Sequence, residues 1–282
     1  MRLAHIPIIL ATALTSSLAT AEPLEVIGDR LFVDVQVNGK PVSALLDSGA
    51  EMTILDDETA VLLGLQPTST ADARGTGAGT VEATFAEGVS LQAVGVTLVN
   101  RTVAILDLDD IAERLVGREL PMILGRDLFD AARLQVDIAG GTIETVGVDE
   151  TPPGVRLELT TRDGIENIPA SVEGHAPVLA NFDLGNGSDV LVGRAYAERI
   201  GLTAPERIID KQSGGGIGGP LNREVVMLES LTVGGVVFRN VRAAIDPGVS
   251  ASDLNIGVRI LRNFLITTDF AQRQLWLAKI AQ

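Results

Sequence analysis

The chain has 282 residues, enough for one large domain or two of ordinary size, and 46% hydrophobic residues allow a sizeable core. It has no cysteine and only two histidines, which excludes disulfides and thiol chemistry and leaves little scope for a His-rich metal site. The net charge of −15 disfavours nucleic acid and anionic membrane surfaces as partners.

The first 21 residues have the order of an export signal. Arg2 gives a positive start, residues 6–14 form a short apolar run, and residues 19–21 (Ala-Thr-Ala) fit a cleavage site. The apolar run is too short to span a bilayer. We therefore expect a signal peptide over residues 1–21, cleaved after Ala21, and an exported protein that is periplasmic or secreted. The alternative interpretation is a buried N-terminal strand.

The remaining chain reads as an internal duplication. Residues 31–55 and 167–191 each show an alternating strand, a turn, a second apolar strand and then Asp-x-Gly. A short helix follows each copy and is predicted at about 57–63 and 194–200. The two motifs are Asp47-Ser48-Gly49 and Asp183-Leu184-Gly185.

The two copies stay in step further along the chain. Each has a Gly-rich stretch, two strands around a turn, an apolar segment ending in Gly with a second short helix, and then a repeated Asp. The Gly-rich stretches are residues 74–79 and 214–219, and the strand pairs are residues 89–106 and 229–245. The apolar segments end in Gly125 and Gly257, and the repeated Asp residues are Asp137 and Asp269. The acidic run Asp107, Asp109 and Asp110 predicts a solvated loop, since it lacks the ligand spacing of a calcium site.

Two adjacent prolines, Pro152 and Pro153, separate the copies and fix an extended link. We therefore predict an N-terminal lobe over residues 22–151 and a C-terminal lobe over residues 152–282. The period-two pattern with many glycine turns predicts a mostly β chain, in which each lobe is a small β-barrel-like unit. A pseudo-two-fold axis would relate the two lobes.

A duplicated Asp-x-Gly suits amide hydrolysis without a metal ion, histidine or cysteine. Two lobes around a pseudo-two-fold axis would bring one Asp each to that axis, where carboxylates so close share one proton. The ionised carboxylate takes a proton from a water molecule, and the protonated one hydrogen-bonds the substrate carbonyl. The Gly after each Asp lets the two loops approach closely.

Residues 46–50 (Leu-Asp-Ser-Gly-Ala), with residues 122–127 (Met-Ile-Leu-Gly-Arg-Asp) downstream, resemble the retropepsin-like aspartic proteases. The resemblance covers about residues 25–280, and two such units in one chain look like the pepsin-type arrangement. It implies that Asp47 and Asp183 are the catalytic pair of an aspartic endopeptidase. It also implies a peptide or protein substrate, a monomeric chain, and no metal or organic cofactor.

The same resemblance implies supporting roles for further residues. Ser48 would hydrogen-bond across to the other loop, and the neighbouring positions would shape and support the two Asp loops. Those positions are Gly49, Gly185, Asn186, Gly125 and Gly257. The Gly-rich stretches look like flaps over the substrate, with Gly77 in the first and Gly216, Ile217 and Gly218 in the second.

The second motif departs from the family pattern at three positions. Leu184 stands in place of Thr or Ser, Asn186 in place of Ala or Ser, and Asn255 in place of an apolar residue. A second hypothesis is therefore a catalytically degenerate protein of the same fold, whose cleft holds a peptide or cell-envelope ligand without cutting it. A third is that the first lobe acts as a homodimer, with the second lobe as support.

Overall fold

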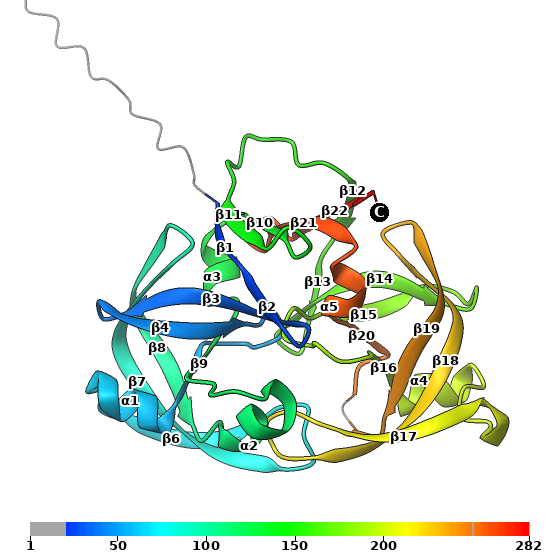
Figure 1. Cartoon of the computed structure of the whole chain (residues 1–282), viewed down its shortest axis with the longest axis horizontal. Coiled ribbons are helices and arrows are strands. Elements are labelled where there is room, and N and C mark those ends of the chain that lie inside the picture. Colours follow the sequence, from blue (N-terminus) through cyan, green and yellow to red (C-terminus); the bar gives the residue numbers. More distant parts are fainter. Residues whose placement is uncertain (1–20, 250, 282) are drawn as a thin grey trace, which may run out of the picture.

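The structure, a computed structural model, describes residues 21–249 and 251–281. The predicted export signal lies outside the described residues, apart from Ala21. The chain is mostly β and forms two similar lobes that lie side by side, which confirms the predicted fold class (Figure 1). Within the part of the chain that is described, none of the helices combines the length and apolar character needed to traverse a bilayer.

The first lobe is built on an eight-stranded sheet. Its strands follow the order β2 (Glu25–Ile27), β3 (Arg30–Val37), β4 (Lys40–Leu46), β9 (Met122–Leu124), β5 (Ile54–Asp56), β8 (Val96–Leu106), β7 (Thr80–Ala93) and β6 (Ser69–Arg74). Strand β3 also pairs with β7, so strands near opposite ends of this order meet. The sheet therefore folds over and encloses an apolar core.

The second lobe repeats this sheet strand for strand. Its order is β13 (Thr160–Arg162), β14 (Ile165–Val172), β15 (Val178–Phe182), β20 (Leu254–Ile256), β16 (Val190–Gly193), β19 (Val236–Asp246), β18 (Leu221–Val233) and β17 (Ile208–Gly214). The extra pairing recurs between β14 and β18. The turns before β4 and β15 also correspond, because Asn38 and Glu173 both have a φ of 49° and each precedes a glycine. The duplication read from the sequence is therefore a structural one.

Four helices lie where the duplication predicts them. They are α1 (Asp57–Leu63) and α4 (Arg194–Arg199), then α3 (Arg126–Ala131) and α5 (Val258–Leu261). Helix α1 begins at Asp56, whose side chain accepts a hydrogen bond from the N–H of Thr59, and it ends at Gly64 with a φ of 78°. A 3-10 turn, η2 (Pro205–Arg207), precedes β17 in the second lobe.

The prediction of a solvated loop after β8 is correct for the acidic side chains, which are exposed, and wrong for the backbone, which is mostly helical. This segment forms α2 (Asp109–Ile111), which continues into the π-helix η1 (Ala112–Val116). Ile111 and Ala112 are buried in an apolar cluster of the first lobe, and Asp110 pairs with Arg114 at 2.7 Å. The acidic residues suggested solvent exposure, but the apolar residues that follow them cover the sheet. In the second lobe the connection from β19 to β20 is shorter.

A third sheet joins the two lobes. It has the order β1 (Glu22–Pro23), β11 (Thr142–Thr145), β10 (Leu134–Asp137), β21 (Phe264–Asp269), β22 (Gln274–Lys279) and β12 (Val155–Glu158). At its centre Gln135 pairs with Thr267, and these two residues are equivalent positions, each two residues before the repeated Asp137 or Asp269. A residue that pairs with its own equivalent lies on the pseudo-two-fold axis. The lobe boundary near residue 152 stays a prediction.

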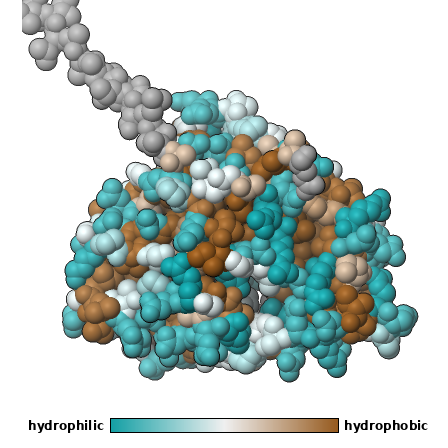
Figure 2. All heavy atoms as spheres, viewed as in Figure 1, coloured by the Kyte–Doolittle hydropathy of each residue, from teal (hydrophilic) through white to brown (hydrophobic). Residues whose placement is uncertain are grey.

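The main apolar core runs through both lobes and beneath the joining sheet. Aliphatic side chains dominate it, and among its few aromatic residues Phe129 stacks on Phe270 with 5.2 Å between ring centroids. Hydrophilic side chains cover much of the outer rim of the visible face, and hydrophobic ones gather nearer its middle (Figure 2). Burial of this shared core, at about 25 cal/mol per Å², holds the two lobes in one arrangement.

Our first prediction concerns a buried ion pair between the lobes. Arg133 binds Asp269 at 2.9 Å, and its guanidinium also donates to three backbone carbonyls of residues 147–150. Because Arg133→Ala leaves a buried carboxylate and these carbonyls uncompensated, we expect the free energy of unfolding to fall by about 3–5 kcal/mol in urea denaturation. Arg194→Ala, which breaks the more exposed pair with Glu224, should cost at most about 1 kcal/mol. Equal losses in the two variants would contradict this.

Candidate active site

The first Asp loop begins where a strand at the centre of the sheet ends. Strand β4 lies parallel to β9, with Leu46 beside Leu124. The N–H of Asp47 then donates to the carbonyl of Leu124 at 3.0 Å, so the ladder extends one residue into the loop. Gly125 follows on β9, and a Cβ there would stand 2.4 Å from the carbonyl oxygen of Met52. The absence of a side chain at Gly125 therefore lets the Asp47 loop curl over β9.

The second Asp loop has the same construction. Phe182 of β15 lies beside Ile256 of β20, and the N–H of Asp183 donates to the carbonyl of Ile256 at 3.1 Å. Gly257 occupies the position of Gly125, and a Cβ there would lie 2.1 Å from the carbonyl oxygen of Asn186. Both Asp side chains thus leave parallel strand pairs at equivalent points of the two lobes.

The two carboxylates face each other across the axis. A Cβ added to Gly185 would stand 2.2 Å from the carboxyl carbon of Asp47 and 2.4 Å from each of its oxygens. A Cβ added to Gly49 would lie 3.0 Å from Oδ1 of Asp183. Each carboxylate therefore rests on the glycine of the other loop, and the structure brings together the two Asp residues that the sequence pairs.

Ser48 joins the two loops by hydrogen bonds. Its Oγ donates to the carbonyl of Phe182 at 2.9 Å and accepts from the N–H of Leu184 at 2.9 Å, and Ser48 itself is buried. A single hydroxyl thus satisfies one donor and one acceptor of the opposite loop. These two hydrogen bonds hold the backbone of the second Asp loop in a fixed position relative to the first loop.

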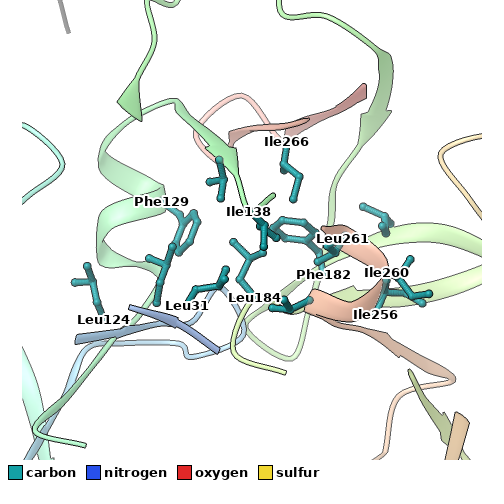
Figure 3. Packing of buried hydrophobic residues seen from close by; sticks show 14 of the residues in the cluster. Leu31, Leu124, Phe129, Ile138, Phe182, Leu184, Ile256, Ile260, Leu261 and Ile266 are labelled. Atoms are coloured by element: carbon teal, nitrogen blue, oxygen red, sulfur yellow. The ribbon is translucent and has the colours of Figure 1, made fainter. Parts of the chain in front are cut away.

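Leu184 replaces the matching hydroxyl with apolar packing. Its side chain is fully buried and points into the core between the lobes, among residues of both halves such as Leu31, Ile138 and Phe182 (Figure 3). Exchange of a buried hydroxyl bridge for apolar groups of suitable shape can be nearly neutral in stability. The second loop is therefore anchored by burial, where the first is anchored by Ser48.

Asp183 accepts more hydrogen bonds than Asp47 does. The N–H groups of Gly185 and Asn186 donate to its Oδ1 at 2.9 and 3.0 Å, and Nδ2 of Asn255 donates to its Oδ2 at 2.6 Å. For Asp47 the corresponding bond is a single one, from the N–H of Gly49 at 2.7 Å. The two carboxylates at the axis therefore have unequal surroundings, with three donors on Asp183 and one on Asp47.

Sequence reasoning missed Asn255 as a donor to the pair and treated it only as a departure from the family pattern. Its side chain is oriented by Asn186, whose Nδ2 donates to Oδ1 of Asn255 at 2.8 Å. The signal was present in the duplication, because the equivalent residue of β9 is the apolar Ile123. A buried polar residue in a strand triplet that is otherwise apolar requires a partner, and here the partner is a carboxylate.

The pKa of Asp47 is raised from 3.8 to about 7. Burial is the largest cause, followed by the negative charge of Asp183 and a hydrogen bond between the two side chains. The N–H of Gly49 and the positive charge of Arg30 act in the opposite direction. The two carboxylates therefore titrate as a unit, and the pair keeps a proton to a higher pH than an isolated Asp does.

Arg30 is a second residue that the sequence analysis missed. It lies at the start of β3, is buried, and donates from its guanidinium to the carbonyl of Gly185 at 2.9 Å. Burial lowers the pKa of Arg30, while the charges of Asp183 and Asp47 raise it. This cation of the first lobe thus supports the second Asp loop and offsets part of the charge of the pair.

The two hairpin tips predicted as flaps meet each other. They lie at residues 75–79 between β6 and β7 and at residues 215–220 between β17 and β18, and they approach at the bottom centre of Figure 1. The N–H of Gly77 donates to the carbonyl of Ile217 at 2.9 Å, and a Cβ on Gly77 would lie 2.4 Å from the carbonyl carbon of Gly218. Glycine is required at this tip because the two backbones touch.

Arg114 of η1 holds the second tip from the opposite lobe. Its guanidinium donates to the carbonyls of Gly214, Gly215 and Gly216 at 3.1, 3.0 and 3.5 Å, while Asp110 binds its other edge. The segment that the sequence analysis interpreted as a solvated loop therefore positions the second flap.

One group of acidic side chains in the described residues lies close enough to hold a cation. Asp56, Asp107 and Asp109 have carboxylate oxygens within 4.8 Å of one another. Both carboxylate oxygens of Asp56 already accept hydrogen bonds, one from the N–H of Thr59 and the other from the N–H of Leu108. The group lies at the start of α1 and is separate from the Asp pair.

Comparison with known proteins gives one result that bears on this geometry. A family model described as "Aspartyl protease" matches residues 33–128 and again residues 168–260, which together make up more than half of the chain. The two matched segments contain Asp47 and Asp183 respectively. A search of curated proteins gives no match.

The close fit of Asp47 against Gly185 leads to our second prediction. The backbone of Gly185 does not have a positive φ, and the three atoms nearest to a Cβ there all belong to the Asp47 carboxylate. We expect Gly185→Ala to lower the free energy of unfolding by about 1–3 kcal/mol through overpacking. Asp47→Ala introduced together with it should remove that loss, because it removes the opposing group.

A double-mutant cycle in urea measures this coupling. Strictly additive effects of Gly185→Ala and Asp47→Ala would show that the two loops do not touch in this way.

Proposed function

The chain belongs to the aspartyl protease family, and on that premise we propose that it is an aspartic endopeptidase in which Asp47 and Asp183 activate one water molecule. The observation that carries the proposal is the close approach of the two carboxylates, each of which rests on the glycine of the other loop. A shared proton between two such groups supplies both a base and an acid for amide hydrolysis.

The unequal environments of the two carboxylates assign their roles. Asp183, with three donors, is the ionised partner that takes a proton as the water oxygen bonds to the substrate carbonyl carbon. Asp47, with its raised pKa, keeps its proton near neutral pH and donates a hydrogen bond to the carbonyl oxygen. The proton held by Asp183 then passes to the amide nitrogen as the carbon–nitrogen bond breaks, which releases an acid and an amine.

The other two hypotheses gain less support. A binding protein without activity would be favoured by an Asp183 side chain that turned away from Asp47, whereas the Asp183 carboxylate instead rests on Gly49 of the Asp47 loop. A homodimer of first lobes would be required if the second lobe lacked its own Asp at the axis, and Asp183 occupies that position. We propose a monomer that acts on peptides or proteins, and an exported location based on residues 1–21.

Our third prediction is the loss of peptide cleavage in Asp47→Ala. Removal of one member of the pair removes the shared proton, so kcat/KM on unstructured peptides should fall by at least about 100-fold. Asp137→Ala is the matched control, because this carboxylate accepts from the N–H of Gly140 in a distant turn. Both variants should keep the far-UV circular dichroism spectrum of the wild type. Cleavage at the wild-type rate by Asp47→Ala would overturn the proposal.

The fourth prediction concerns pH. The folded protein keeps the proton of Asp47 up to about pH 7, whereas the unfolded chain loses it near 3.8. In that interval the folded state binds more protons, so the contribution of Asp47 to stability, fully present below 3.8, is lost as pH rises through about 7.

The same titration limits activity, because the rate should fall as Asp47 deprotonates above about pH 7. Urea denaturation of wild type and Asp47→Asn across this range isolates the contribution to stability, since the variant lacks the titrating group. A pH dependence of stability that is the same in both proteins, or a cleavage rate still rising at about two pH units above that pKa, would contradict this assignment.

A further inference from the structure

The two lobes differ sharply at equivalent positions beside the Asp pair. Three neighbouring strands of each sheet carry one residue each in a lateral row, which we call the first row in the first lobe and the second row in the second lobe. The first row is Phe32, Leu45 and Ile123 on β3, β4 and β9, and the second row is Asn167, Asn181 and Asn255 on β14, β15 and β20. The strand pairings match in the two sheets, so three apolar residues in one lobe stand where the other has three asparagines.

Both rows occupy the sheet face that lies away from the main core. Ala180 and Phe182, on either side of Asn181 along β15, belong to the main core, and so do both neighbours of the central member of the first row. Successive residues of a strand point to opposite faces, so the rows point the other way. Asn255 shows what this face looks toward, since its side chain reaches the carboxylate of Asp183.

The first row forms part of an apolar surface between the Asp loop and the flap. Its members belong to a cluster that also includes Ala50 and Met52 of the Asp47 loop and Ile217 at the tip of the second flap. The members of the row are buried, and the cluster extends from the Asp47 loop to the tip of the second flap. The second row holds the corresponding position in the other lobe.

The second row has unused hydrogen-bonding groups. Oδ1 of Asn167 is buried without a hydrogen-bond partner, while its Nδ2 donates to the carbonyl of Ile165. The side-chain amide of Asn181 makes no hydrogen bond among the described residues, although the residue is only 9% exposed. An unsatisfied buried polar group costs about 1–3 kcal/mol, so this row is a place where a polar ligand gains binding energy.

We propose that the second row is a specificity site for an uncharged polar side chain beside the scissile bond, either a carboxamide or a hydroxyl. The side-chain amide of Asn181 offers N–H donors and a carbonyl acceptor, and carboxamides and hydroxyls can both donate and accept. The first row binds an apolar side chain on the other side of the bond. This inference rests on the proposed function, because it places a peptide across the Asp pair.

Access to both rows requires the flap tips to separate. The tips are joined by two backbone hydrogen bonds, from Gly77 to Ile217 and from Gly79 to Gly218, at 2.9 and 2.8 Å. Such bonds are individually weak in water, so an arriving peptide can replace them with bonds of its own.

The test compares Asn181→Leu with the reciprocal variant Leu45→Asn. These two residues are equivalent in the duplication, and each lies two residues before the Asp of its own lobe. Peptide libraries are digested and the residues on both sides of each cleaved bond are identified by mass spectrometry. Peptide pairs that differ only by Asn or Leu at one of those positions then give ratios of kcat/KM.

For the wild type we expect Asn, Gln, Ser or Thr on one side of the cleaved bond and apolar residues on the other. Asn181→Leu should lower the preference for Asn over Leu by about tenfold or more on the polar side only. Leu45→Asn should change the preference on the apolar side only. Apolar, or charged, residues on both sides in the wild type, or an unchanged profile in Asn181→Leu, would overturn the inference.

Binding separates this inference from the proposed function. Asp47→Ala, with and without Asn181→Leu, is immobilised and the same Asn or Leu peptide pairs are bound to it. If the wild type cuts no peptide but Asn181 still determines the preference for Asn in binding, the specificity site stands and the endopeptidase proposal fails. If cleavage occurs without any preference that depends on Asn181, the endopeptidase proposal stands and the specificity site fails. Should Asn181→Leu fail to fold, Asn181→Ala serves in its place.

Discussion

The contact between the carboxylate of Asp47 and the backbone of Gly185 is the constraint on which the rest of the site depends. There is no room for even one carbon atom between them, so the two loops can cross only if a glycine stands at this point. The crossing buries Asp47 and places the negative charge of Asp183 beside it, and both effects raise the pKa of Asp47. Gly125, Gly257 and the bridge from Ser48 all serve to hold this approach.

The sequence predicts the parts of this arrangement that repeat. The duplication, the four short helices and the pairing of Asp47 with Asp183 follow from motifs at equal spacing, because equivalent residues take equivalent places around a pseudo-two-fold axis. The joining sheet could not be predicted in the same way. Its central pairing, Gln135 with Thr267, links residues far apart in the chain that carry no sign of their partner.

The features that the sequence analysis missed are those in which the copies differ. Asn255 and Leu184 were recognised as departures from a pattern, but a departure does not say what replaces the lost interaction. The structure gives the replacements, an amide hydrogen bond to Asp183 and apolar packing between the lobes. Among the described residues, the helical segment of Arg114 belongs to one lobe alone, so the duplication offered no second copy against which to interpret it.

The same differences between the copies make the two sides of the Asp pair chemically unequal. A symmetric pair of carboxylates would have equal surroundings, whereas here the donors are concentrated on Asp183 and the pKa of Asp47 is raised. Asn255 is both a donor to Asp183 and a member of the polar row, so one residue links the position of the charge to the chemistry of the adjoining surface. A peptide bound across the Asp pair, as proposed above, would contact the apolar first row on one side and the asparagines of the second row on the other. Only one of its two orientations would match both rows.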